Sequence, residues 1–152
     1  MAIAIFTTWT TYGTWLPGDE RGWYKHGEGV RDPDQLRKFA VSLLMNERAI
    51  SLDLDQRRIV EETIVEHCTI RNWVLHAVNC RTNHVHAVVT APNRDIEVPR
   101  EQFKAWCTRK LKLRENPMCP IRENWWTDRG WDEYIDDDAS LAGVIEYVME
   151  RQ

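Results

Sequence analysis

Asn83-His84-Val85-His86-Ala87-Val88-Val89 is the most informative segment of this 152-residue chain, because it places two histidines within an apolar run. In a β-strand successive side chains alternate between faces, so His84 and His86 would project from the same side. Their Cα atoms would lie about 7 Å apart, a separation at which two imidazoles can hold one metal ion. The alternative is a half-buried strand in which hydrogen bonds satisfy each ring, since many two-histidine spacings bind nothing.

The flanking residues predict an α+β domain. A second apolar run, Asn72 to Val78, precedes the histidine segment across a short polar link, which indicates a hairpin. The remaining elements are a strand over 2–12, helices over 33–49, from Asp53 or Asp55 to 67 and from Pro99, two short strands within 124–134, and a helix after Asp136-Asp137-Asp138. This order predicts a ferredoxin-like fold, with helices packed on a mainly antiparallel sheet, as one domain over residues 1–152.

Composition narrows the function classes. The formal net charge is -4, so any contact with nucleic acid must come from a local basic surface. The four cysteines form no Cys-x-x-Cys pair and indicate reduced thiols, with a zinc site from Cys68 or Cys80 and a nearby His67 or His76 as the alternative. No apolar run approaches the roughly 18 residues of a membrane span, so we expect a cytoplasmic protein without a membrane partner.

Two segments are candidates for contacts with nucleic acid. The glycine-rich loop after residue 12 carries Trp15 and Trp23, whose rings either pin the loop to the core or stack on unpaired bases. The helix from Pro99 either presents an ordinary solvated face or contacts phosphates. Its candidate contact residues are Arg100, Lys104, Arg109, Lys110 and Lys112, followed by Arg114.

The last helix carries an apolar stripe and a tyrosine on its flank. Leu141, Val144, Ile145 and Val148 share one side, and Tyr147 lies about 110° around the helix from the centre of that stripe. A flanking tyrosine is usually a rim residue, but it can also hang over an adjoining site.

The chain resembles the single-tyrosine HUH transposases, which include the REP-associated tyrosine transposases. Three features carry the resemblance: Asn83-His84-Val85-His86, Glu146-Tyr147-Val148, and the opening Trp9-Thr10-Thr11-Tyr12-Gly13-Thr14-Trp15-Leu16-Pro17-Gly18-Asp19. It extends from Phe6 to the end of the chain. It implies an enzyme that cuts single-stranded DNA beside small hairpins through a 5′-phosphotyrosine link and then rejoins strands, and that usually works as a homodimer.

The resemblance also implies roles for individual residues. His84 and His86 match the ligands of a divalent metal, Mg²⁺ or Mn²⁺, and Tyr147 matches the nucleophile. Relatives commonly add a metal-binding Gln or Asn one turn after the tyrosine. Here that position is Arg151, so Gln152 becomes the candidate third ligand, with Glu150 as the fallback.

Three functions are therefore open at this point. The first is metal-dependent nicking and joining of single-stranded DNA through Tyr147. The second is a domesticated or decayed relative that binds hairpin DNA without cutting it. The third is a metal hydrolase of another class, although the sequence lacks a further histidine-carboxylate cluster to complete such a site.

Overall fold

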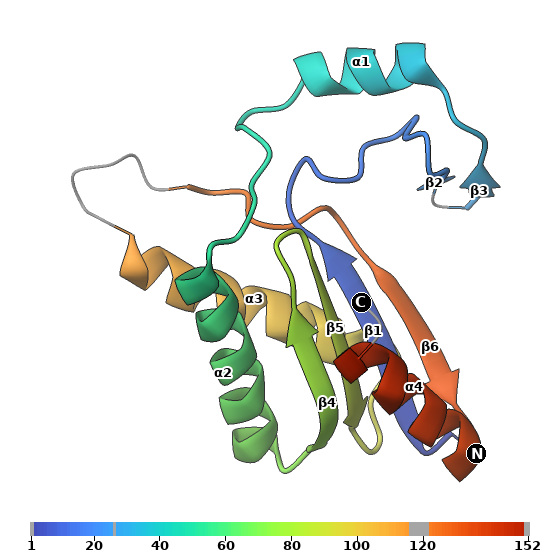
Figure 1. Cartoon of the computed structure of the whole chain (residues 1–152), viewed down its shortest axis with the longest axis vertical. Coiled ribbons are helices and arrows are strands. Elements are labelled where there is room, and N and C mark those ends of the chain that lie inside the picture. The colour runs from blue at the N-terminus through green and yellow to red at the C-terminus, as the bar shows by residue number, and fades with distance from the viewer. Residues whose placement is uncertain (1, 26, 116–121, 151–152) are drawn as a thin grey trace.

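A computed structural model describes residues 2–25, 27–115 and 122–150 of the protein (Figure 1). Its main sheet has four antiparallel strands in the order β4-β5-β1-β6. These strands are β1 (Ala4–Thr10), β4 (Val74–Cys80), β5 (His84–Thr90) and β6 (Trp131–Ile135). The helices are α1 (Gln35–Leu43), α2 (Leu54–Arg71), α3 (Val98–Arg114) and α4 (Asp138–Glu150).

The α+β prediction is confirmed. Along the chain the core elements run β1-α2-β4-β5-α3-β6, and β1 lies between β5 and β6 in the sheet. This is the ferredoxin-like arrangement, in which each helix connects two strands across a neighbour. The final helix predicted after the acidic run is also present. None of the described helices is both long and apolar enough to cross a bilayer.

The sheet separates two apolar clusters. On one face α2 and α3 bury Ile64 and Phe103 against the β5 side chains of Val85 and Val89. On the other face α4 buries Val148 against Val88 and its neighbours. Because strand side chains alternate, each face receives every second residue of β5, and this alternation keeps the α2–α3 layer apart from α4.

Some boundaries differ from those expected. α1 is shorter than the expected 33–49, and Asp34 caps it, because the Asp34 carboxylate accepts a hydrogen bond from the Arg37 amide. Asp53 caps α2 and forms a capping box with Gln56. Only one strand, β6, forms within 124–135, and the expected first strand there is reduced to an isolated bridge between Thr11 and Trp126.

The glycine-rich segment forms a small hairpin of its own. β2 (Trp23–Lys25) pairs with β3 (Gly29–Arg31), and together with α1 it lies beyond one end of the main sheet (Figure 1). α1 buries none of its residues. Its apolar side chains, which include Leu36, Phe39 and Leu43, therefore remain exposed.

Candidate functional site

The predicted pair of histidines lies on one face of the sheet. His84 and His86 of β5 project to the α4 side, and their ring centroids are 4.9 Å apart. The intervening Val85 is fully buried in the α2–α3 cluster on the opposite face. The strand alternation expected from the sequence is therefore present, and it brings the two imidazoles together.

Hydrogen bonds hold one nitrogen of each imidazole. The Nδ1 atom of His86 lies 2.7 Å from the Thr8 hydroxyl of β1, and the Nδ1 atom of His84 lies 2.8 Å from the Asn83 side-chain oxygen. The Asn83 oxygen can only accept, so this contact fits the His84 tautomer that carries its proton on Nδ1. Side-chain partners of this kind fix the tautomer and orientation of histidines that bind metal.

Burial keeps His86 neutral. The ring is 8% exposed and stacks on Phe6 with centroids 5.5 Å apart. Burial, together with the nearby His84, lowers the pKa of His86 from 6.5 to about 4. A neutral imidazole at physiological pH is the form that can bind a metal ion.

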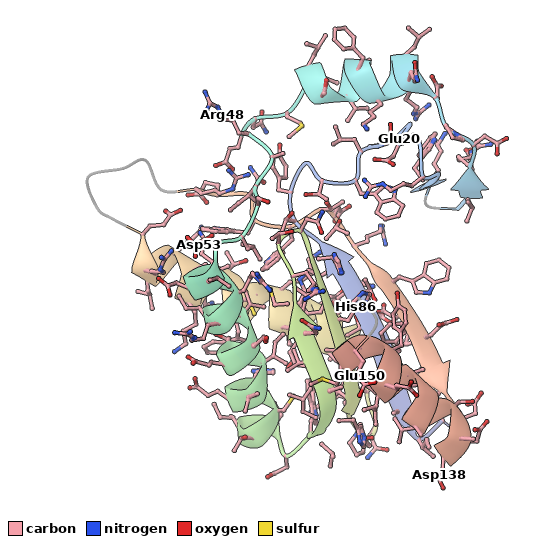
Figure 2. All side chains as sticks on the ribbon, viewed as in Figure 1. Glu20, Arg48, Asp53, His86, Asp138 and Glu150 are labelled. Atoms are coloured by element: carbon pink, nitrogen blue, oxygen red, sulfur yellow. The ribbon has the colours of Figure 1, made fainter. Side chains whose placement is uncertain are left out.

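Tyr147 of α4 meets this pair from the same chain. Its ring centroid is 5.7 Å from that of His86 and 6.3 Å from that of Phe6, and its side chain is 44% exposed. Figure 2 shows His86 on the sheet beside the end of α4 at which Glu150 is labelled. The apolar stripe faces the sheet as expected, and the flanking tyrosine lies over the histidine site.

Asn79 of β4 ties α4 to the sheet. It pairs with His86 in the register, and its side-chain amide donates to the Val148 carbonyl at 2.9 Å. Val148 directly follows Tyr147, so this bond holds the turn of α4 that carries the phenol. No sequence pattern pointed to Asn79 or Thr8, because their roles depend on the strand register.

The two histidines suit a divalent ion but do not complete a ligand set. Among residues 2–25, 27–115 and 122–150, no three His, Cys, Asp or Glu side chains form a metal-binding group. Glu150, the fallback ligand, therefore does not join the histidines in such a group. Gln152, the other predicted ligand, lies outside the described residues.

The predicted zinc alternative finds no support in the described part of the chain, where no such cluster contains a cysteine. Cys68 and Cys80 are buried, and burial raises the pKa of each thiol to about 12. Thiols in this state are inert structural side chains, because the thiolate is the metal ligand.

The basic helix lies on the other face of the sheet. α3 buries Phe103 and Cys107 in the α2–α3 cluster, opposite the histidines. Arg109 stacks on Trp106 with its guanidinium carbon 4.6 Å from the ring centroid, and Lys110 and Lys112 form ion pairs with acidic side chains. The structure therefore does not bring these three predicted DNA contacts to the histidine site.

Two further predicted contacts in this helix have structural partners. Arg100 is 7% exposed and pairs with Asp132. The Lys104 ammonium group donates to the carbonyls of Thr127 and Arg129, and burial lowers its pKa to about 8. These partners engage both side chains within the chain, and their contact with phosphates stays a prediction.

The two tryptophans of the glycine-rich segment also have partners within the chain. Trp23 is 9% exposed and its indole donates to the Asp32 carbonyl, so its ring is held locally at the β2–β3 hairpin and lies in neither apolar cluster of the main sheet. Trp15 is 37% exposed, but the Arg21 guanidinium covers its ring at 4.1 Å and its indole donates to the Gly22 carbonyl. Neither ring presents a bare face at the histidine site.

Among the solved structures that share this architecture is a REP-associated tyrosine transposase bound to a REP hairpin. The match has a TM-score of 0.56 and 14% identity, and it covers 97% of this chain and 66% of that chain. The chain has the fold of a tyrosine transposase. No family model matches it, and no curated protein does. At this identity the fold is what the two proteins share, and the α+β architecture with a final helix expected from the sequence pattern is confirmed.

Proposed function

We propose that the protein nicks and rejoins single-stranded DNA with Tyr147 as its nucleophile. The observation that carries this proposal is the grouping of His84, His86 and Tyr147 on one face of the sheet, with the tyrosine ring 5.7 Å from that of His86. The transposase fold supports the same reading, because the structure with that fold was solved with a hairpin bound.

The reaction exchanges one phosphodiester linkage for another, so the number of such linkages stays constant. The Tyr147 oxygen bonds to phosphorus and loses its proton, while the bond from phosphorus to the 3′ oxygen breaks and that oxygen gains a proton. A 3′ hydroxyl can later attack the phosphotyrosine and reverse these changes, so no nucleotide cofactor is consumed. A phenol with a pKa near 10 is a weak nucleophile at neutral pH, and the phosphate must therefore be made more electrophilic.

His84 and His86 are the side chains that would hold a divalent cation, Mg²⁺ or Mn²⁺. Such a cation neutralises charge on a phosphate and orients its oxygens when bound. The chain's own residues prepare the site: Thr8 and Asn83 orient the imidazoles, and Asn79 holds the helix turn that carries the phenol. Because the phenol and imidazoles meet within one chain, the proposed site does not require the homodimer expected from the resemblance.

The decisive assay incubates the protein with labelled single-stranded hairpin DNA and Mg²⁺ or Mn²⁺, and looks for a protein-DNA band that survives denaturation. Tyr147→Phe should abolish the band and retain DNA binding. Tyr134→Phe is the matched control, since Tyr134 is 53% exposed and lies on β6 opposite Ile5, whose side chain belongs to the other face.

The histidines have a control of their own. His84→Ala and His86→Ala should lose the band, whereas His76→Ala, on β4 and bonded to Thr90, should keep it. A band that persists in Tyr147→Phe would rule out this tyrosine as the nucleophile. Hairpin binding without any metal-dependent band in the wild-type protein would instead favour the non-catalytic, hairpin-binding alternative.

A further inference from the structure

A row of four residues crosses the sheet at the level of the histidine site. In the strand register Asn79 of β4 lies opposite His86 of β5, His86 lies opposite Thr8 of β1, and Thr8 lies opposite Trp131 of β6. Residues aligned in this way project from the same face. Trp131 therefore shares the surface of the candidate site, two strands and about 10 Å from His86.

Trp131 differs from the other tryptophans in its exposure. It is 54% exposed, whereas Trp15 and Trp106 are 37% and 38% exposed and lie under arginine side chains. Among the described residues, no ring or guanidinium stacks on Trp131. An exposed aromatic ring beside a candidate site offers a face on which an unpaired base can stack.

The backbone that presents this ring is firmly held. The Lys104 ammonium donates to the carbonyls of Thr127 and Arg129, just before β6. Gly130 packs so closely that a Cβ atom there would lie 2.5 Å from the Thr8 carbonyl oxygen. The indole is thus carried on an anchored strand, which lowers the conformational cost of binding a ligand.

The surroundings favour a base over a phosphate as the ligand. Glu133, two residues along β6, lies on the same face opposite Phe6 and is exposed. A carboxylate repels a phosphate but not an uncharged ring. The backbone of α4 lies closer to β4 and β5 than to β6, the strand that carries Trp131.

We propose that Trp131 is a stacking platform for an unpaired nucleobase next to the phosphate held at the histidine–tyrosine site. This inference rests on the proposed function, and it adds a base-binding subsite at the β6 edge of the sheet. Every base has a π-face, so the subsite would accept bases with little sequence preference. Its role is to position the strand, while the reacting groups stay on β5 and α4.

The test measures binding alone, in a Tyr147→Phe background that cannot form the covalent link. The two probes, each with Mn²⁺, are a labelled strand of twenty thymidylates and a strand of twenty abasic sugar-phosphates. Trp131→Leu should weaken thymidylate binding roughly 5- to 150-fold and leave abasic binding unchanged. Trp131→Phe, which keeps an aromatic face, should recover most of the affinity.

Tyr134→Leu is the matched control, because it removes a similarly exposed ring from the opposite face of the same strand. Three results would each overturn the inference. Tyr134→Leu could lose as much affinity as Trp131→Leu, Trp131→Leu could lose the same affinity for both probes, or Trp131→Leu could bind thymidylates as well as the unsubstituted background. If Trp131→Leu binds normally while the wild-type protein forms the covalent band, the platform is wrong and the proposed nicking stands. If the wild-type protein binds neither thymidylates nor hairpin DNA, both are wrong.

Discussion

The hydrogen bond from Asn79 to α4 leads to a quantitative prediction about how the proposed nucleophile is positioned. The Asn79 amide donates to the Val148 carbonyl at 2.9 Å, one residue after Tyr147. Asn79→Ala removes this donor and leaves the apolar contacts of α4 with Val88 and Ala77 in place. A hydrogen bond of this kind contributes about 0.5–1.5 kcal/mol net to stability.

That range sets the size of two effects. The melting temperature should fall by about 2–4 °C for a loss near 1 kcal/mol in a domain of this size. If the loss acts locally on the last turns of α4, amide exchange there should accelerate roughly 2- to 13-fold. Asn79→Asp keeps the shape but replaces the donor with an acceptor, so its effect should be larger than that of alanine.

Hydrogen exchange resolved by segment is the measurement that separates local from global loss. Asn124→Ala is the matched control, since the Asn124 amide donates to Glu47 at 2.7 Å, and neither residue belongs to the cluster around α4. It should lower the melting temperature without a specific change in α4. Unchanged exchange in α4 of Asn79→Ala, or an equal acceleration in both variants, would refute the reasoning. The covalent band should weaken in Asn79→Ala in step with the exchange.

Three further predictions concern side chains that support the site. Thr8→Val keeps the shape of the side chain but removes the hydroxyl next to His86. It should weaken Mn²⁺ binding about 10- to 100-fold in a titration. An unchanged affinity would contradict the orienting role of Thr8. Because the pKa of His86 falls from 6.5 to about 4 on folding, the unfolded chain binds more protons between those values. The contribution of this group to stability is thus complete above about pH 6.5 and is lost as the pH falls towards 4. Urea unfolding in EDTA at pH 7 and pH 5 measures this loss. The free energy of unfolding should fall less between these pH values in His86→Phe than in the wild type. Lys104→Met should lower the melting temperature through the lost contacts to Thr127 and Arg129 while the salt dependence of DNA binding stays the same, since a phosphate contact would instead reduce that slope by about one unit.

The local patterns in the sequence were sufficient to predict the strands and helices of the main sheet and its two faces, and the shared face of the histidines. Period-two alternation in β5 and period-3.6 spacing in α4 depend only on neighbouring residues, and both patterns appear in the structure. Tyr147 could be placed on the flank of its stripe for the same reason. The distance from Tyr147 to His86 could not be predicted, because it depends on how α4 lies across the sheet.

The features that the sequence did not reveal depend on long-range packing. Periodicity showed which side of α3 is buried, but it did not show which face of the sheet α3 covers. The right-handed rule for crossovers between parallel strands contains that information, since it puts α2 and α3 on the same side. The side made by Val85 and Val89 is uniformly apolar and suits that helical layer, so the basic residues of α3 belong opposite the histidines.

A single extra residue in β4 also shapes the site. The register shifts between Leu75 and Ala77, so that Leu75 pairs with Val89 and Ala77 pairs with Val88. With an uninterrupted ladder, Val78 would lie opposite His86, and Asn79 would point into the α2–α3 cluster. The bulge reverses the alternation of the strand beyond it, which is how such irregularities redirect side chains near functional sites. Asn79 can hold α4, and with it the proposed nucleophile, only because of this irregularity.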